Sequence, residues 1–320
     1  MQDAGYMKKQ IADRIKGFME SRDKSNCIFI KCLKAQFIII LMLIASPIYG
    51  AFENVDSGAR SLGMGSAFVS VADDASSIFN NPAGMAQADQ NELSMSYMEL
   101  YGLVSYSSIS CIQKIQKNVF GIGVISSNDR DDIYQEMEVL FAYGRQIAEN
   151  ANIGINIRYL SSYSYLDGAK LGNGKGIAID LGYKYWIPDK GISFGLDFHG
   201  PIGFIFYNRK AILGFGAEKY SQRTDFYHNI GISIDLAKEF PVLDKFLLVG
   251  ELSDGRFCSG AEYTYDNLIS IRSGLRLGNS LNRTWTTGLG FRLSAVKIDF
   301  AYISSPVNAD TSQISVSIDW

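Results

Sequence analysis

Residues 296–302 read Val-Lys-Ile-Asp-Phe-Ala-Tyr, and residues 314–320 read Ile-Ser-Val-Ser-Ile-Asp-Trp. In both stretches every second residue is aliphatic or aromatic, and the residues between them are small, polar or charged. Because successive side chains of a β-strand point to opposite faces, this period of two places the apolar side chains on one face. The pattern recurs from Asn91 onward without comparable helical periodicity, so we expect an all-β fold.

About fourteen such segments follow Asn91, and residues 200–222 are the hardest to assign. Each segment with its connection has roughly 16 residues, which suits a transmembrane strand of about 9–11 residues and a loop of about six. Residues that tolerate hairpin turns separate the segments. These turn signals include Asp167-Gly168, Asn173-Gly174, Pro188–Gly191, Asp254-Gly255 and Gly278–Ser280.

Two architectures fit alternating strands, a soluble sandwich and a closed membrane barrel. The polar face is often charged, as expected for a barrel lumen, and aromatic residues lie near strand ends, as in interfacial girdles. A sheet in lipid must close because no backbone group can stay unpaired there. We therefore favour a transmembrane antiparallel β-barrel. The charged positions are Arg158, Asp180, Lys184, Arg272, Arg276, Arg292, Lys297 and Asp299, and the aromatic ones Tyr159, Tyr185, Trp285 and Tyr302.

The apolar run Phe37–Ile44 is too short to span a bilayer. Lys31 and Lys34 precede it and small residues follow, which predicts a signal peptide cleaved near Gly50 or Ala51. We expect residues 1–50 to be a leader, in which Met7 or Met19 could be the true start. Of the 30 Lys/Arg and 33 Asp/Glu, eight and four lie in this leader, which leaves a net charge of about −7. A nucleic-acid partner is not expected for such an acidic chain.

Few residues of this chain suit catalysis or metal binding. Cys111 and Cys258 are the cysteines outside the leader, and a disulfide between them is not expected. His199 and His228 lie near no recognisable nucleophile motif, so rim or loop positions are the simpler interpretation. We predict no enzymatic activity, no cofactor and no metal site.

The segment Ser61–Gln87 reads SLGMGSAFVSVADDASSIFNNPAGMAQ and differs from the strands. Gly63-Met-Gly65 lacks the third glycine of a dinucleotide loop, because Phe68 stands in that place. Adjacent acids without a nearby histidine make a poor metal site. We expect a compact element instead: a strand, a short helix capped by Asp73 or Asp74 that ends near Asn80, and a second turn begun by Asn81-Pro82.

The string Gly58–Ala86 resembles the N-terminal signature of the outer-membrane barrel superfamily that includes the long-chain fatty-acid transporter FadL. Its nearest match is the PorV/PorQ type of type IX secretion, although Asn80 and Ser66 depart from that pattern. The resemblance implies a barrel of about 14 strands (residues 91–320) with a small N-terminal hatch (residues 51–90) in its lumen. The hatch or gate residues would be Gly63, Gly65, Asp73, Asp74, Asn81, Pro82, Ala83 and Gly84.

The resemblance also implies an outer-membrane location in a Gram-negative-type bacterium and two possible functions. The first is an accessory role in protein secretion or surface assembly, with envelope or secreted proteins as partners besides membrane lipid. The alternative is FadL-like passive transport of a hydrophobic small molecule such as a fatty acid or hydrocarbon. Glycines 121 and 123 could then mark a bent strand at a lateral opening. An apolar pocket could be lined by Phe68, Ile78, Phe79 and Met85, which could equally form the hatch's own core.

Overall fold

The computed structural model describes residues 57–210, 216–240, 243–278, 283–304 and 310–320. The expected signal peptide and the first residues of the expected hatch lie outside these ranges. The described chain contains fifteen β-strands and a few very short helices. Within these residues no helix is long and apolar enough to cross a membrane.

The strands begin at Glu92, directly after the predicted boundary. They are β1 (Glu92–Leu100), β2 (Val104–Ile115), β3 (Asn118–Asp129), β4 (Tyr134–Ala148), β5 (Ala151–Leu166), β6 (Ala169–Ile187), β7 (Ile192–Arg209), β8 (Glu218–Arg223), β9 (Tyr227–Asp235), β10 (Lys245–Ser253), β11 (Arg256–Tyr265), β12 (Ile269–Leu277), β13 (Arg283–Leu293), β14 (Val296–Ser304) and β15 (Thr311–Asp319). The helices are α2 (Ala59–Gly63), α3 (Ser77–Asn80) and the 3₁₀ turns η1 (Gly84–Gln87), η2 (Pro188–Lys190) and η3 (Leu236–Lys238).

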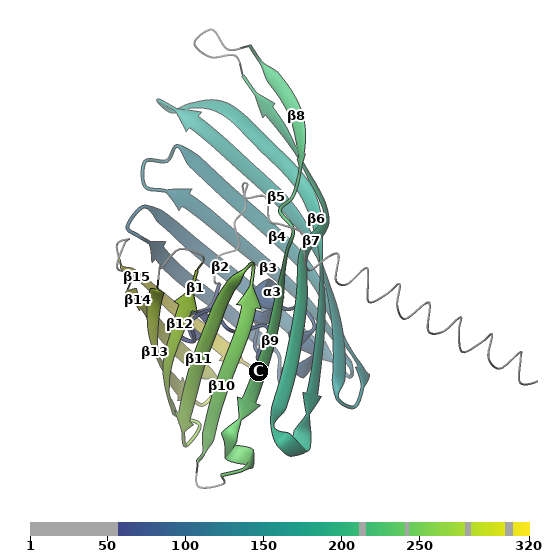
Figure 1. Ribbon diagram of the computed structural model, residues 1–320. Helices are drawn as coiled ribbons and strands as arrows, with labels where there is room; N and C mark the ends of the chain where they lie inside the picture. The colour runs from purple at the N-terminus through teal and green to yellow at the C-terminus, as the bar shows by residue number, and fades with distance from the viewer. Residues whose placement is uncertain (1–56, 211–215, 241–242, 279–282, 305–309) are drawn as a thin grey trace, which may run out of the picture. The chain divides into compact units, whose positions relative to one another are not determined.

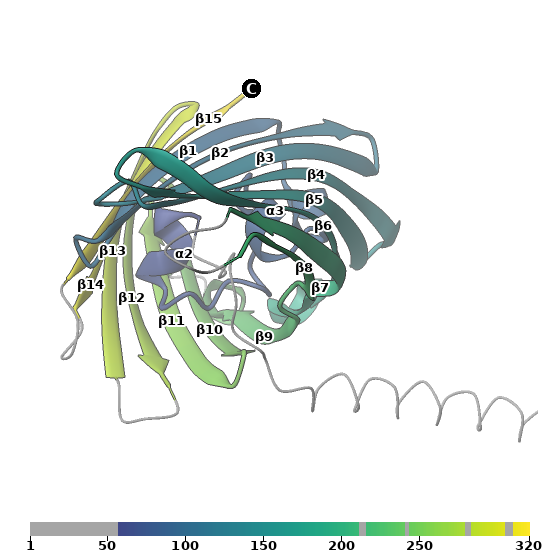
Figure 2. The same ribbon diagram turned by 90° about the horizontal axis from the view of Figure 1, so that it is seen from above.

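The strands form one closed antiparallel barrel (Figures 1 and 2). Strand β1 pairs with β15, and β6 pairs with β7, so the ladder runs all the way round. Strands β8 and β9 both pair with β7, the former along Phe204–Arg209 and the latter along Ile192–His199. The two therefore occupy one place in the wall, and the barrel has fourteen strand positions. This confirms the predicted barrel and excludes the sandwich.

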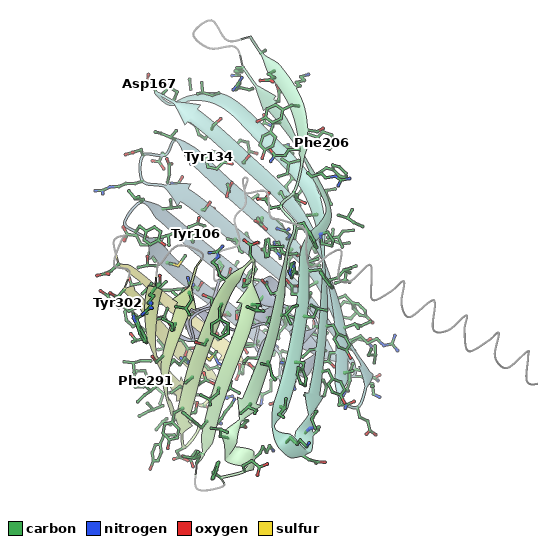
Figure 3. The ribbon with its side chains drawn as sticks, in the orientation of Figure 1. Tyr106, Tyr134, Asp167, Phe206, Phe291 and Tyr302 are labelled. Atoms are coloured by element: carbon green, nitrogen blue, oxygen red, sulfur yellow. The ribbon has the colours of Figure 1, made fainter. Side chains whose placement is uncertain are left out.

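The apolar face of each strand points away from the lumen. In β14 the side chain of Phe300 is 45% exposed, whereas that of its neighbour Ala301 is fully buried. Figure 3 shows Phe291 and Tyr302 pointing outward from the wall. A sandwich would bury this face, but a barrel in a bilayer presents it to lipid. The belt of exposed aliphatic and aromatic side chains therefore marks the membrane-facing surface.

The wall is taller on one side. Strands β4 to β7 have 15, 16, 19 and 18 residues, whereas β1, β12, β14 and β15 have nine each. The long strands rise toward the end that carries the β5–β6 and β7–β8 hairpins (Figure 1), which we call the tall end. The opposite end holds the start of β1 and the end of β15, and we call it the terminal end.

Residues 57–90, the described part of the hatch, lie inside the barrel, with α2 and α3 enclosed by the ring of strands in Figure 2. The expected end of a helix near Asn80 is confirmed by α3. The expected strand before it is wrong, because residues 59–63 form α2. This helix is closed by the Leu62 N–H bond to Gly58 O and ends before Gly65, whose φ is +69°. Its short, largely buried turn satisfies the backbone locally instead of through a ladder.

Candidate functional site

The hatch backbone rests directly on glycines of the barrel wall. Gly144, Gly154 and Gly182 pair with one another across β4, β5 and β6. A Cβ at Gly154 would lie 2.2 Å from the carbonyl carbon of Pro82, and one at Gly182 would lie 2.3 Å from Asn81 Oδ1. Only a residue without a side chain allows this approach. The glycine row is therefore the seat of the Asn81-Pro82-Ala83 turn.

Two further glycine pairs seat other parts of the hatch. The first pair joins β7 and β9, where a Cβ at Gly195 would lie 2.2 Å from Val69 O. The second joins β11 and β12, where a Cβ at Gly274 would lie 2.1 Å from Gly65 N. Glycines at alternate, lumen-facing positions of neighbouring strands could thus have predicted where the hatch contacts the wall. The paired glycines are Gly195 with Gly231 and Gly260 with Gly274.

Gly121 and Gly123 of β3 serve the same purpose. The ladders of β3 with β2 and β4 run without a register shift, so the wall stays paired at these glycines. A Cβ at Gly123 would lie 2.9 Å from the ring of Phe79. These glycines make room for hatch side chains.

The four apolar candidates of the hatch are buried against the wall. Ile78, Phe79 and Met85 pack in one cluster with wall side chains such as Ile112 and Leu140. Phe68 packs in a second cluster that includes wall residues of β10 and β11. Each of the four is at most 5% exposed. They pack between hatch and wall, so the core they form is shared with wall side chains.

Polar side chains of the lumen bind the hatch backbone. Glu251 accepts hydrogen bonds from the N–H groups of Phe68 (2.7 Å) and Val69 (2.9 Å). Lys184 donates to the carbonyl oxygens of Val71 and, at 3.2 Å, of Ala72. A buried irregular segment needs such partners for its backbone groups. Around these bonds the polar lumen face is packed against the hatch.

Asn81 ties the hatch to itself and to β6. Its side chain is fully buried, and Nδ2 donates to Val69 O (2.9 Å) and to Tyr183 O (3.2 Å). Its Oδ1 accepts from Ala83 N (3.1 Å), which begins the predicted second turn. The nearby Gly84 is confined too, since a Cβ there would lie 2.0 Å from Ala72 O.

The two adjacent acids lie at an ion-pair cluster that we call the Arg60 cluster. Arg60 of α2 contacts Asp73 (2.5 Å) and Asp74 (3.3 Å) in the hatch and Glu262 (2.8 Å) on β11. Glu262 also pairs with Arg272 of β12 at 2.6 Å. Asp74 also accepts from Ser76 N (2.9 Å) just before α3, near the expected cap. The cluster therefore links the hatch to the wall by charge.

Electrostatics keep this link ionised. Burial alone would raise the pKa of Asp73, but the guanidinium of Arg60 outweighs it and holds that pKa well below its ordinary value. About a third of the Asp73 side chain is exposed, so solvent screens part of the attraction. The pair stays charged throughout the neutral range.

A polar cavity of about 380 Å³ adjoins the Arg60 cluster at the terminal end. Lys297 there contacts Glu92 (3.1 Å) and Asp319 (2.9 Å), and Arg292 contacts Asp319 (2.8 Å). Five basic and seven acidic side chains line this cavity. Its chemistry suits water and ions, and none of the four apolar candidates lines it.

His199 and the two cysteines lie on strands of the wall. His199 is buried, with Nδ1 3.5 Å from Asp180 Oδ1 and its ring stacked on Tyr227 at 4.4 Å. Asp180 also pairs with Arg158 at 3.1 Å. Cys111 and Cys258 lie on β2 and β11 and are not joined in a disulfide. Within the described ranges no three His, Cys, Asp or Glu side chains are grouped as a metal site.

Comparison with known proteins shows which solved structures have a similar fold. No family model and no curated protein sequence matches the chain. Among solved structures, the toluene transporter TbuX of Ralstonia pickettii matches with a TM-score of 0.60 and 13% identity, over 84% of this chain and all of that one. The monoaromatic hydrocarbon channel CymD matches with a TM-score of 0.57 and 15% identity, over 84% of this chain and 97% of that one.

A FadL homologue of Pseudomonas aeruginosa gives a TM-score of 0.59 and 11% identity, over 86% of this chain and all of that one. The chain has the fold of these FadL-type barrels. The similarity covers 84–86% of this chain. At such low identity it establishes the fold, and function has to be argued from the site.

Proposed function

We propose that this chain is a channel of the outer membrane of a Gram-negative-type bacterium through which hydrophobic small molecules pass, with the hatch as its gate. The shared fold supports this function, because TbuX and CymD are transporters or channels of toluene and monoaromatic hydrocarbons. The apolar belt supports the membrane location. The proposal requires a hatch that can leave its seat while the wall stays closed.

The observation that carries the proposal is the Arg60 cluster beside a polar cavity. Arg60 of α2 pairs with Glu262 of the wall and, within the hatch, with Asp73 and Asp74, so this one side chain joins both parts of the hatch to β11. All four side chains line the adjoining polar cavity. The Arg60–Asp73 pair is partly exposed and contributes little net stability, whereas the Arg60–Glu262 pair is buried and is the stronger part of the latch. The wall itself is held by a closed ladder of paired strands, in which the latch side chains take no part.

The predicted hatch residues divide into two roles under this proposal. Asp73 and Asp74 are the latch, held by Arg60. The other residues are the contact residues of the hatch, because each lies where hatch and wall approach closely or where the hatch turns. The contact residues are Gly63, Gly65, Asn81, Pro82, Ala83 and Gly84.

A second candidate function is the PorV/PorQ-like accessory role in protein secretion or surface assembly. One observation favours it: the lumen around the hatch is filled with ion-paired and hydrogen-bonded groups, and the four apolar candidates are packed in a core. A barrel with a permanently seated hatch would present only its rims to envelope proteins. The fold comparison favours the channel over this role.

Uptake by whole cells tests the channel. Gram-negative cells that produce the full chain are given radiolabelled toluene or a long-chain fatty acid, and accumulation is compared with cells that carry an empty vector. We expect faster uptake, and a further increase with Arg60→Gln, which loosens the latch. The matched control is Arg209→Gln, which breaks an exposed ion pair with Glu218 at the tall end. Uptake equal to the vector control for every variant would contradict the channel.

A further inference from the structure

The outward surface of β6 changes character toward the tall end. Going up this strand, the outward side chains are Ile179, then Ile177, which is 60% exposed, and then Lys175. On β7 the same face continues with Phe204 and Phe206, and Phe206 is 65% exposed. Lys175 lies directly across from Phe206 in the ladder. The aliphatic belt thus ends in a mixture of aromatic rings and cations.

Three exposed cations lie on this edge next to aromatic rings. Lys170 Nζ lies 4.0 Å from the centre of the Tyr163 ring, and Arg223 Cζ lies 5.9 Å from that of Phe204. Lys175 is the third. Within the described residues none of the three forms an ion pair with a carboxylate, unlike Arg209, which is held by Glu218 at 2.8 Å. Their positive charge is available to a partner outside the barrel.

Other places around the tall end carry different outward residues. At the tall end of β1 the exposed outward residue is Glu99, and at that of β14 the hydroxyl of Tyr302 donates to Asp310. Figure 3 shows Phe206 and Tyr302 on opposite sides of the barrel. An exposed arginine, Arg283, also lies at the tall end of β13, but β5 to β8 bring three cations and their aromatic rings together.

We propose that this surface, the Lys175 patch, binds the phosphate group of an anionic membrane lipid. The patch comprises Tyr163, Lys170, Lys175, Phe204, Phe206 and Arg223. Its lower border is continuous with lipid-facing Ile177 and Ile202, so a molecule whose phosphate contacts the cations lays its acyl chains along the belt. Aromatic rings and Lys or Arg at the level of headgroups are the side chains that anchor such lipids.

This continuity is what selects a lipid over other anions. A free phosphate would gain from the cations but not from the phenylalanines. An acidic protein would have to reach a surface that borders directly on acyl chains. The lipid satisfies both halves of the patch at once, and it does so whatever passes through the lumen.

Native mass spectrometry of the purified full chain in neutral detergent tests the proposal. We expect phosphatidylglycerol to be retained in preference to phosphatidylcholine. Replacing the three cations together (Lys170→Gln, Lys175→Gln, Arg223→Gln) is expected to weaken that preference by at least about tenfold, since each cation near a membrane surface adds to the attraction. Phe206→Gln is expected to weaken retention with the charge unchanged.

The matched control removes three exposed cations elsewhere (Lys117→Gln, Arg145→Gln, Lys190→Gln) and is expected to keep the preference. Every variant is first checked for the gel shift between unheated and heated samples, which reports a folded barrel. Equal loss in the control triple would overturn the proposal, because general charge would then explain the binding. Full displacement of the lipid by inorganic phosphate at the same concentration would also overturn it, because the site would then be one for a free ion.

Discussion

Gly154→Ala tests whether the glycine rows hold the hatch in place. The new Cβ would lie 2.2 Å from the carbonyl carbon of Pro82 and 2.3 Å from Ala83 N, whereas ordinary contacts begin near 3.4 Å. Because both neighbours are backbone atoms, the hatch has to move by about 1 Å. Overpacking of this kind costs about 1–3 kcal/mol. The cost falls on the seated hatch alone, so the unseated population should rise about 5- to 150-fold.

The assay measures how fast a buried hatch thiol reacts. Ser70→Cys places the thiol at a fully buried hydroxyl that has no hydrogen-bond partner in the structure, in a chain with Cys111→Ser and Cys258→Ala. Its reaction with a water-soluble maleimide reports unseating, and we expect Gly154→Ala to accelerate it within the stated range. The gel shift on heating should persist, since the β4–β5–β6 ladder keeps its bonds.

Gly250→Ala is the matched control, because the nearest atom to its new Cβ, on Phe257, lies 4.0 Å away. This variant should leave the labelling rate unchanged. Equal labelling rates for Gly154→Ala and Gly250→Ala, with both barrels intact, would show that the glycine row does not hold the hatch in place.

Three further results are expected from the hatch. Asn81→Ala removes the hydrogen bonds that Asn81 donates to Val69 O and Tyr183 O and should destabilise the seated hatch by about 1–3 kcal/mol. Thiol labelling should then be faster. An unchanged labelling rate would show that Asn81 does not hold the hatch in place. Arg60→Gln should raise the open probability in planar bilayers above that of the control Arg209→Gln, and equal traces would contradict the latch. Because the pKa of Asp73 is depressed, its contribution to the stability of the latch is complete above the ordinary aspartate pKa of about 4 and is lost as pH falls below that value. Channel conductance should therefore be constant from pH 7 to about 5 and rise only in stronger acid. A rise already at pH 6 would point to another group.

Local periodicity was enough to predict the wall. Alternation in residues 296–302 and 314–320 corresponds to β14 and β15, and the onset of strands after Asn91 corresponds to β1. Such patterns are readable because burial in lipid imposes the same two-sided constraint on every strand. Strands could not be assigned within residues 200–222 from the sequence, and the structure shows why. There β7 changes partner from β9 to β8, with Gly200 at a φ of +64° between them.

The hatch was less readable because its backbone is held by distant residues. The sequence of residues 59–63 alone does not predict their hydrogen-bond partners, because these lie far along the chain. Ser315 accepts a bond from the Ala59 N–H (2.8 Å), and Thr286 donates one to Gly63 O (3.1 Å). The proximity of Asp73 and Asp74 to Arg60 likewise depends on how the hatch folds back inside the wall. The lumen-facing glycines were visible, but each alone has several explanations, and only their cross-strand pairing identifies the seat.

Native mass spectrometry on the barrel gently extracted from its own membrane shows whether hydrophobic small molecules use a route gated by the hatch. We expect a bound molecule of fatty-acid or hydrocarbon mass, present in the wild type and lost more readily from Arg60→Gln than from Arg209→Gln. An empty barrel that co-purifies with another envelope protein would contradict the channel and favour the secretion accessory.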